Sequence, residues 1–123
     1  MLKTFAFIGS VFGLLAVAMG AFGAHAMQSR LEPRLLDVWE TAARYQMYHA
    51  LALFAAAWLV GRTESAWPVV GGWLFVAGIV IFCGSLYGLA ASGLDWLGAI
   101  TPIGGLAMMG GWLCCAVAAT RLA

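Results

Sequence analysis

Four long stretches of apolar residues, separated by short polar segments, run along this chain. They cover about residues 4–26, 45–61, 68–91 and 96–120. A helix crosses the ~30 Å hydrocarbon core of a bilayer with about 20 apolar residues at ~1.5 Å per residue. The first, third and fourth stretches are long enough, and the second, the shortest, is sufficient if the Arg44 side chain extends toward the membrane surface. The pattern therefore predicts an all-α membrane protein with four transmembrane helices.

The segment of about residues 30–44, between the first two stretches, alternates apolar and polar positions at helical spacing. Its apolar side carries Leu31, Leu35 and Trp39. Its polar side carries Asp37, Glu40, Thr41 and Arg44. This pattern predicts an amphipathic helix, which either lies in the membrane interface or extends the second span directly. In both placements Glu40 and Arg44, one helical turn apart, can form an ion pair.

Short connections determine the predicted topology. Residues 62–67 join the second and third spans, and 92–95 join the third and fourth, with Gly93 as the expected end of the third helix. Connections of this length make neighbouring helices antiparallel, so we predict one domain, residues 1–123, that forms an up-down-up-down four-helix bundle. Both termini then lie on one side. We place them in the cytoplasm, because a pair between Arg44 and Glu40 would leave fewer free cations on the opposite side.

The composition supports a membrane protein. Of the 123 residues, 64% are hydrophobic and 9% are charged, with a mean hydropathy of +0.97, whereas an average soluble domain is about half apolar and a quarter charged. The formal net charge of +1 gives no reason to expect a nucleic-acid partner. The first apolar stretch is longer than the roughly 7–15-residue core of a secretory signal, so we expect it to remain as a span.

Small residues are spaced for close packing on three of the four predicted spans. The pairs and the stripe are Gly9 with Gly13, Gly20 with Ala24, Gly84 with Gly88, and Gly104 with Ala107 and Gly111. In a bilayer, close approach through small residues replaces the hydrophobic effect in holding helices together. The spacing predicts a tightly packed bundle, a homo-oligomer, or both. Pro102, which cannot donate a backbone hydrogen bond, is expected to kink the fourth helix.

In the predicted topology, polar side chains gather at the membrane surface opposite the termini. The six that form a candidate polar pocket are His25, Glu40, Arg44, Gln46, His49 and Asp95. His49 follows Arg44 by five residues and lies ~7 Å deeper in a helix. Ionisable groups at such depth normally face the interior of the protein. His49 is therefore the first candidate for a functional residue.

Two histidines on neighbouring helices leave three alternatives open. They could ligate a haem, hold a metal ion together with Glu40 or Asp95, or form a polar, proton-sharing cluster. Haem requires both imidazoles at matched depth, and His25 is shallower than His49, while a zinc site requires about three or four ligands. The polar cluster is the preferred interpretation, so no cofactor and no metal are predicted. The cysteines are interpreted as small buried residues: Cys83, Cys114 and Cys115.

The sequence does not predict an enzyme, because no nucleophile–base pair, phosphate-binding glycine loop or carboxylate pair occurs at usable spacing. The leading hypothesis is a structural or interaction role, in which the bundle packs among membrane lipids with itself or with a larger membrane protein. The alternative is a small transport or ligand-binding module that uses the polar pocket around the two histidines. A redox accessory protein that uses the histidine pair is the third hypothesis.

Four motifs, in this order, resemble a known family. They are Gly20–Ala26, Tyr45–Leu51, Phe82–Tyr87 and Thr101–Gly105. Together they are similar to the small bacterial inner-membrane family catalogued as domain of unknown function 423, and to the eukaryotic transmembrane protein 256. The resemblance covers essentially the whole chain and implies a polytopic protein of the bacterial inner (plasma) membrane. It implies no reaction, substrate or cofactor.

Overall fold

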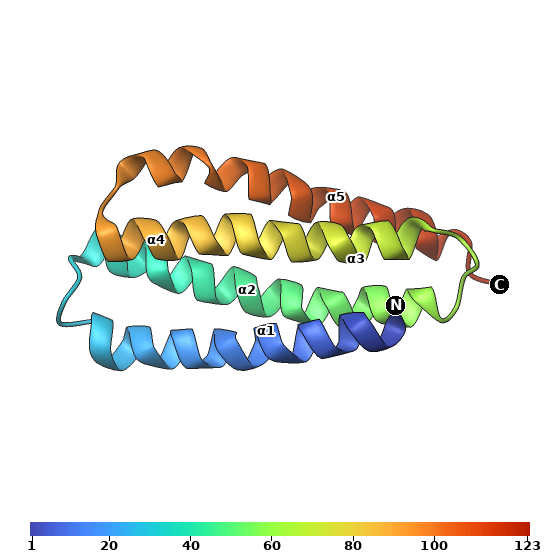
Figure 1. Cartoon of the computed structure of the whole chain (residues 1–123), viewed down its shortest axis with the longest axis horizontal. Helices are drawn as coiled ribbons and strands as arrows, with labels where there is room; N and C mark the ends of the chain where they lie inside the picture. The colour runs from blue at the N-terminus through green and yellow to red at the C-terminus, as the bar shows by residue number, and fades with distance from the viewer.

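The chain is folded entirely into helices, which form four long segments lying side by side (Figure 1). The computed structural model describes all residues, 1–123. The first segment consists of α1 (Leu2–Phe22) and a π-helical turn, η1 (Gly23–Met27), and the second is α2 (Pro33–Val60). The prediction of an all-helical chain is confirmed.

The third and fourth segments each contain an irregular turn. The third consists of α3 (Trp67–Gly78), the π-helical turn η2 (Ile79–Cys83) and α4 (Gly84–Ser92). The fourth consists of a 3-10 turn, η3 (Asp95–Ala99), followed by α5 (Thr101–Ala119). α4 and η3 are separated by a sharp turn at which Gly93 has a φ of +72°, a left-handed conformation that glycine adopts without strain.

Three of the four segments are helices long and apolar enough to cross a membrane: Leu2–Met27, Trp67–Ser92 and Asp95–Ala119. α2 differs because its first half carries charged side chains. These are Arg34, Asp37, Glu40 and Arg44. The rest of α2, residues 45–60, carries no Asp, Glu, Lys or Arg.

The amphipathic segment is continuous with the second apolar stretch, because α2 runs for 28 residues without a break. Pro33 lies in its first turn, where the missing N–H has no partner to lose, and no glycine or further proline interrupts the helix before Gly61. The predicted ion pair between Glu40 and Arg44 is wrong. Arg44 Nη2 instead donates to Thr41 Oγ1 at 3.3 Å, and that hydroxyl is held by its own bond to the Asp37 carbonyl.

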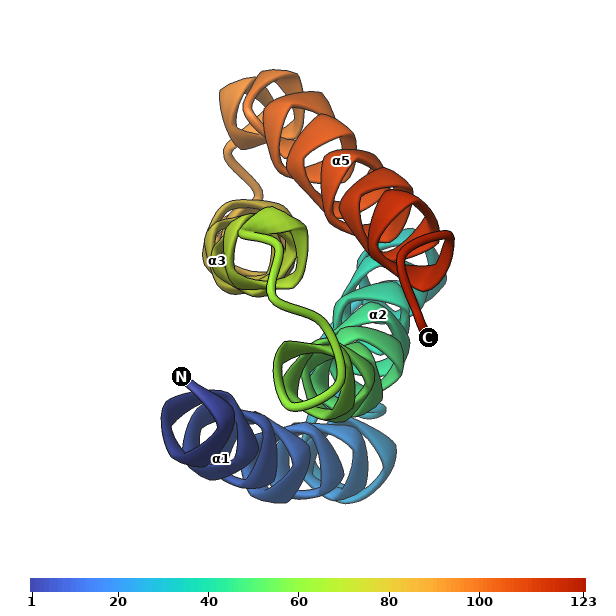
Figure 2. The same cartoon turned by 90° about the vertical axis from the view of Figure 1, so that its right-hand side faces the viewer.

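The helices alternate in direction, and both termini lie at the same end of the molecule (Figure 1). Seen from that end, α2 and α3 lie between α1 and α5 (Figure 2). α1 packs mainly on α2, and α5 packs mainly on α3 and η2 while touching α2 at few positions. This uneven packing leaves room between α2 and α5, which matters for the candidate site below.

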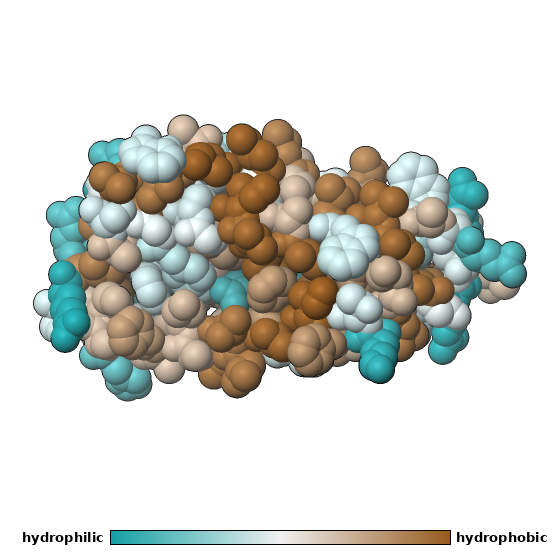
Figure 3. Space-filling view, viewed as in Figure 1, coloured by the Kyte–Doolittle hydropathy of each residue, from teal (hydrophilic) through white to brown (hydrophobic).

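The side chains between the helices form an apolar core, and large apolar side chains also cover the outside. Phe5, Leu53 and Phe75 are fully buried, whereas Leu14, Leu106 and Met109 are each more than 60% exposed. In the space-filling view, hydrophobic residues occupy the middle of the molecule and hydrophilic residues gather at its two ends (Figure 3). This is the surface expected of a protein whose outer face contacts lipid.

The prediction that Pro102 kinks a helix beginning near residue 96 is wrong. The α-helix begins at Thr101, so Pro102 lies in its first turn, and the residues before it, Asp95–Ala99, are 3-10 rather than α-helical. Thr101 Oγ1 contacts Ser85 Oγ at 2.6 Å and donates to the Leu97 carbonyl at 3.3 Å. The contact with Ser85 attaches the start of α5 to α4.

Candidate ligand pocket

The six residues selected from the sequence do not form one pocket. His25 and Asp95 are exposed at the loop end of the molecule, where Asp95 Oδ1 lies 3.8 Å from Arg34 Nη2. Arg44 is exposed on the outer face of α2 and Glu40 is partly buried. Of the six, only Gln46 and His49 are buried. Although both belong to α2, they bind different neighbours.

Gln46 joins three helices. Its Nε2 donates to the Phe12 carbonyl of α1 at 2.9 Å, and its Oε1 accepts from Tyr87 Oη of α4 at 2.8 Å. About two turns away along α2, Trp39 Nε1 donates to the Met19 carbonyl at 2.8 Å, and its ring packs edge-on against Tyr87. Both ends of the Gln46 amide therefore have partners, the Phe12 carbonyl and the Tyr87 hydroxyl. These hydrogen bonds hold α1 and α4 to α2.

We expect Gln46→Leu to lower the free energy of unfolding by about 1–2 kcal/mol, because Tyr87 Oη loses its acceptor in an apolar environment. The measurement is reversible unfolding in mixed detergent micelles, followed by circular dichroism. Ser10→Ala is the control, since the Ser10 hydroxyl is exposed and bonds only within its own helix. Equal stability of the two variants would contradict a role for Gln46 in joining the helices.

His49 lies between α2 and α5 and is only 6% exposed. Its Nδ1 contacts the Tyr45 carbonyl at 2.8 Å, and its Nε2 lies 3.1 Å from Nε1 of Trp112, which can only donate. A neutral imidazole with its proton on Nδ1 satisfies both contacts. The ring also packs against Phe75. This pair, His49 and Trp112, is the main polar link between α2 and α5.

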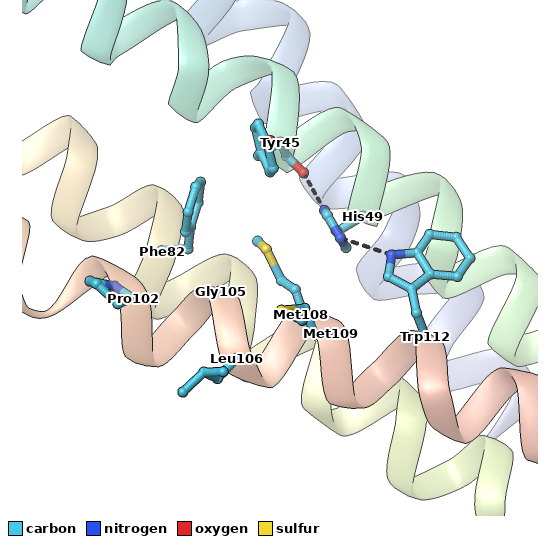
Figure 4. A pocket seen from close by; sticks show the side chains of 9 residues that line it. All are labelled: Tyr45, His49, Phe82, Pro102, Gly105, Leu106, Met108, Met109 and Trp112. Atoms are coloured by element: carbon cyan, nitrogen blue, oxygen red, sulfur yellow. Dashed lines mark hydrogen bonds between the residues drawn. The ribbon is translucent and has the colours of Figure 1, made fainter.

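A pocket of ≈ 580 Å³ lies beside His49, between α2, η2 and α5 (Figure 4). Its lining is mainly apolar. It comprises Tyr45, His49, Phe82, Pro102, Gly105, Leu106, Met108, Met109 and Trp112. Leu106 and Met109, both on α5, are 68% and 67% exposed. The pocket therefore opens through the side of the molecule, toward the surface that lipid would cover.

Close approach of α5 to η2 forms one wall of the pocket. A Cβ on Gly104 would lie 2.8 Å from Phe82 Cα, so only glycine permits this contact. The neighbouring Gly105 faces more open space, where a Cβ would lie 3.8 Å from the Phe82 ring. The π-helical turn at Ile79–Cys83 places Phe82 here, and such turns are frequent at functional sites.

Sequence reasoning identified His49 but missed the other pocket residues. They are apolar or small, and their only common property is the face that they share after folding. Tyr45 and Pro102 belong to motifs that carry the family resemblance, but nothing in the sequence pairs them with Met109 or Trp112. No three His, Cys, Asp or Glu side chains converge in a way that could hold a metal ion.

Helices of membrane-spanning length, an apolar outer surface and a pocket that opens toward that surface define a small polytopic helical membrane protein. The chain belongs to the family described as "Protein of unknown function (DUF423)", whose model matches residues 19–105.

Curated relatives extend the match to nearly the full length. The chain is 45% identical to the UPF0382 membrane protein YwdK of Bacillus subtilis, with 98% of both chains covered. It is 46% identical to the UPF0382 membrane protein SSP2132 of Staphylococcus saprophyticus, covering 91% of this chain and 92% of the relative. The resemblance to family 423 is thus confirmed. No solved structure matches this chain.

Proposed function

We propose that the protein is a four-span protein of the bacterial plasma (inner) membrane with both termini in the cytoplasm. α2 supports a fourth span, because it is packed against α1 and α3, two segments of spanning length, and its 28 residues extend ~42 Å. The count of lysines and arginines supports the orientation, because Lys3, Arg62 and Arg121 lie at the end that carries the termini. Only Arg30 and Arg34 lie at the loop end, since Arg44 is placed further along α2.

Its proposed function is to bind a lipophilic small molecule that enters the pocket beside His49 from the bilayer. The observation that carries this proposal is the pocket itself, which is apolar, opens laterally and has one buried histidine in its wall. Its volume, ≈ 580 Å³, lies in the range of about 300–1,000 Å³ that is typical of small-molecule sites. This is the ligand-binding alternative predicted from the sequence, but of the six predicted pocket residues only His49 lines the pocket.

The lining indicates what such a ligand would look like. Phe82, Leu106 and Met109 offer a large apolar surface, and methionine sulfur packs well against flat aromatic or conjugated groups. His49 is the only buried polar residue of the lining, and both of its ring nitrogens already have partners in the chain, so the ligand needs one hydrogen-bonding group at most. A ring-bearing or isoprenoid lipid fits this description better than a charged metabolite, because the lining contains no charged side chain to offset the cost of removing a charge from water.

The proposal is tested by purifying the protein from its native membrane in a mild detergent and analysing the retained small molecules by native mass spectrometry. His49→Phe keeps a ring of similar size but removes the polar link, so we expect retention to fall by about tenfold. His25→Phe is the matched control, because that histidine is exposed at the loop end. If the wild-type protein retains no lipophilic molecule, or if both variants retain it equally, ligand binding at His49 is wrong.

A second candidate function, self-association, is favoured by the depth of the charged face of α2. Gln46 bonds to Phe12, near the middle of α1, so Arg44 lies only ~3 Å from that level along α2. Arg44 is exposed, Glu40 is half-buried, and neither forms an ion pair within the chain. Two copies related by an axis along the membrane normal would bring Arg44 of one toward Glu40 of the other.

A charge exchange tests this second candidate. We expect Arg44→Glu to reduce self-association in lipid nanodiscs, measured by energy transfer between labelled copies, because four carboxylates would then face one another. The double variant Glu40→Arg/Arg44→Glu should restore it, since the interface regains opposite charges. A wild-type protein that stays monomeric in the bilayer at high protein-to-lipid ratio would contradict the self-association role.

A further inference from the structure

At the end that carries the termini, two arginines line a surface pocket of ≈ 610 Å³. Arg62 follows α2 and Arg121 follows α5, and the rest of the lining is mostly polar. The other residues are Thr63, Glu64, Ser65 and Ala123. Neither arginine forms an ion pair, because both ion pairs of the chain involve Arg34 at the opposite end. Two guanidinium groups thus face one pocket, and neither is paired with the Glu64 carboxylate that also lines it.

The side chains of this pocket are arranged to receive an anion. The Arg62 guanidinium lies 5.0 Å from the centre of the Trp58 ring, a cation–π contact that limits its motion. Thr63 Oγ1 is the one buried side-chain polar atom in the chain that has no hydrogen-bond partner. Turning this hydroxyl toward a ligand would therefore break no existing hydrogen bond.

A second, more apolar pocket of ≈ 390 Å³ adjoins the first and shares Ser65 and Arg121 with it. Its remaining lining is Ala66, Trp67 and Val70, at the start of α3. Trp67 and Val70 are both substantially exposed on the outer face of that helix. Polar and apolar binding surfaces are thus contiguous at the end of two segments that are long enough to span the membrane.

We propose that this pair of pockets binds the phosphate group of an anionic phospholipid, with the start of an acyl chain lying along Trp67 and Val70. Guanidinium groups bind phosphate oxygens through paired, charge-assisted hydrogen bonds. The ends of spanning helices lie at the depth of the lipid head groups, where tryptophan is also enriched. The side chains of the lining carry two guanidinium groups against the one carboxylate of Glu64, an excess of one positive charge that favours anionic over zwitterionic lipids.

The site is tested by native mass spectrometry of the full-length protein with phosphatidylglycerol or phosphatidylcholine at equal concentrations. We expect a preference for phosphatidylglycerol that falls about tenfold in Arg62→Gln or Arg121→Gln and further in the double variant. Arg30→Gln is the control, because Arg30 is an exposed arginine at the opposite end that forms no ion pair. Melting temperatures of all variants verify that the fold is retained.

Competition with inorganic phosphate distinguishes a lipid site from a site for free phosphate. A lipid held by both head group and chain should resist millimolar phosphate, and Val70→Asn should weaken lipid binding because it makes the chain surface polar. Displacement of the lipid by phosphate at that concentration would overturn the assignment to a lipid. Equal lipid binding by the wild type and the double arginine variant, or no preference over phosphatidylcholine, would overturn the site itself.

Discussion

Gly104→Ala is expected to destabilise the protein by about 2–3 kcal/mol, the largest effect of any single methyl group considered. The new Cβ would lie 2.8 Å from both Cα and Cβ of Phe82 and still closer to the Phe82 nitrogen. A flexible side chain could move away, but the backbone of a packed helix cannot do so without separating α5 from η2. The free energy of unfolding in mixed micelles, or the melting temperature in detergent, measures the loss.

Gly84→Ala is the matched control, since nothing lies within 4 Å of the position that its Cβ would occupy. There we expect no loss, and a small gain is reasonable because alanine favours helix over glycine by up to about 1 kcal/mol. If Gly104→Ala and Gly84→Ala had the same melting temperature, α5 and η2 would have to be farther apart than the distances above. If Gly84→Leu weakened self-association without lowering stability, the glycine face would contribute to an interface between copies.

The glycines selected by their spacing divide into two groups in the structure. Four lie at close contacts within the chain: Gly9, Gly88, Gly104 and Gly111. The other three have looser or open surroundings: Gly13, Gly20 and Gly84. Spacing alone cannot separate these groups, because it places residues on a common face without saying what that face meets. For the same reason it missed Gly72, whose Cβ would clash with the Phe5 ring.

The overall arrangement of helices was predictable because it depends on quantities that a sequence displays. Apolar length determines which segments can span, and short connections such as that around Gly93 make neighbours antiparallel. The π-helical turn at Ile79–Cys83 and the 3-10 turn at Asp95–Ala99 were not predicted. Such departures depend on tertiary contacts, here the close approach of α5 to Phe82, and leave no periodic signal.

The candidate site was predictable only at its one buried ionisable residue. His49 is identifiable because an ionisable side chain in an apolar stretch is rare and faces inward. Depth along a helix does not determine direction around it, however. Gln46 and His49 are three residues apart, yet one faces α1 and α4 and the other faces α5. The predicted polar cluster combined residues of similar depth that face different surroundings.

Gly105→Leu is expected to reduce retention of a lipophilic ligand about tenfold or more while leaving the fold intact. Gly105 borders the pocket, and its Cβ would meet only the Phe82 ring, at 3.8–3.9 Å, which is ordinary van der Waals contact. A leucine side chain at this position would extend into the ≈ 580 Å³ pocket and occupy the volume that the ligand needs. The measurement is the mass of co-purified small molecules per mole of protein, together with the melting temperature.

Comparison with the adjacent glycine makes this test specific. Gly104→Ala changes stability because its Cβ meets backbone, whereas Gly105→Leu changes only the volume available beside His49. Gly20→Leu, at a position with nothing within 4 Å and no part in the pocket lining, controls for the added apolar side chain. Comparing Gly105→Leu with His49→Phe separates the two contributions to ligand binding. Loss of the ligand in His49→Phe alone would indicate that the polar link is essential. Loss in Gly105→Leu alone would indicate that the shape of the pocket is sufficient. Unchanged retention in both variants would place the ligand outside this pocket and exclude the proposed function.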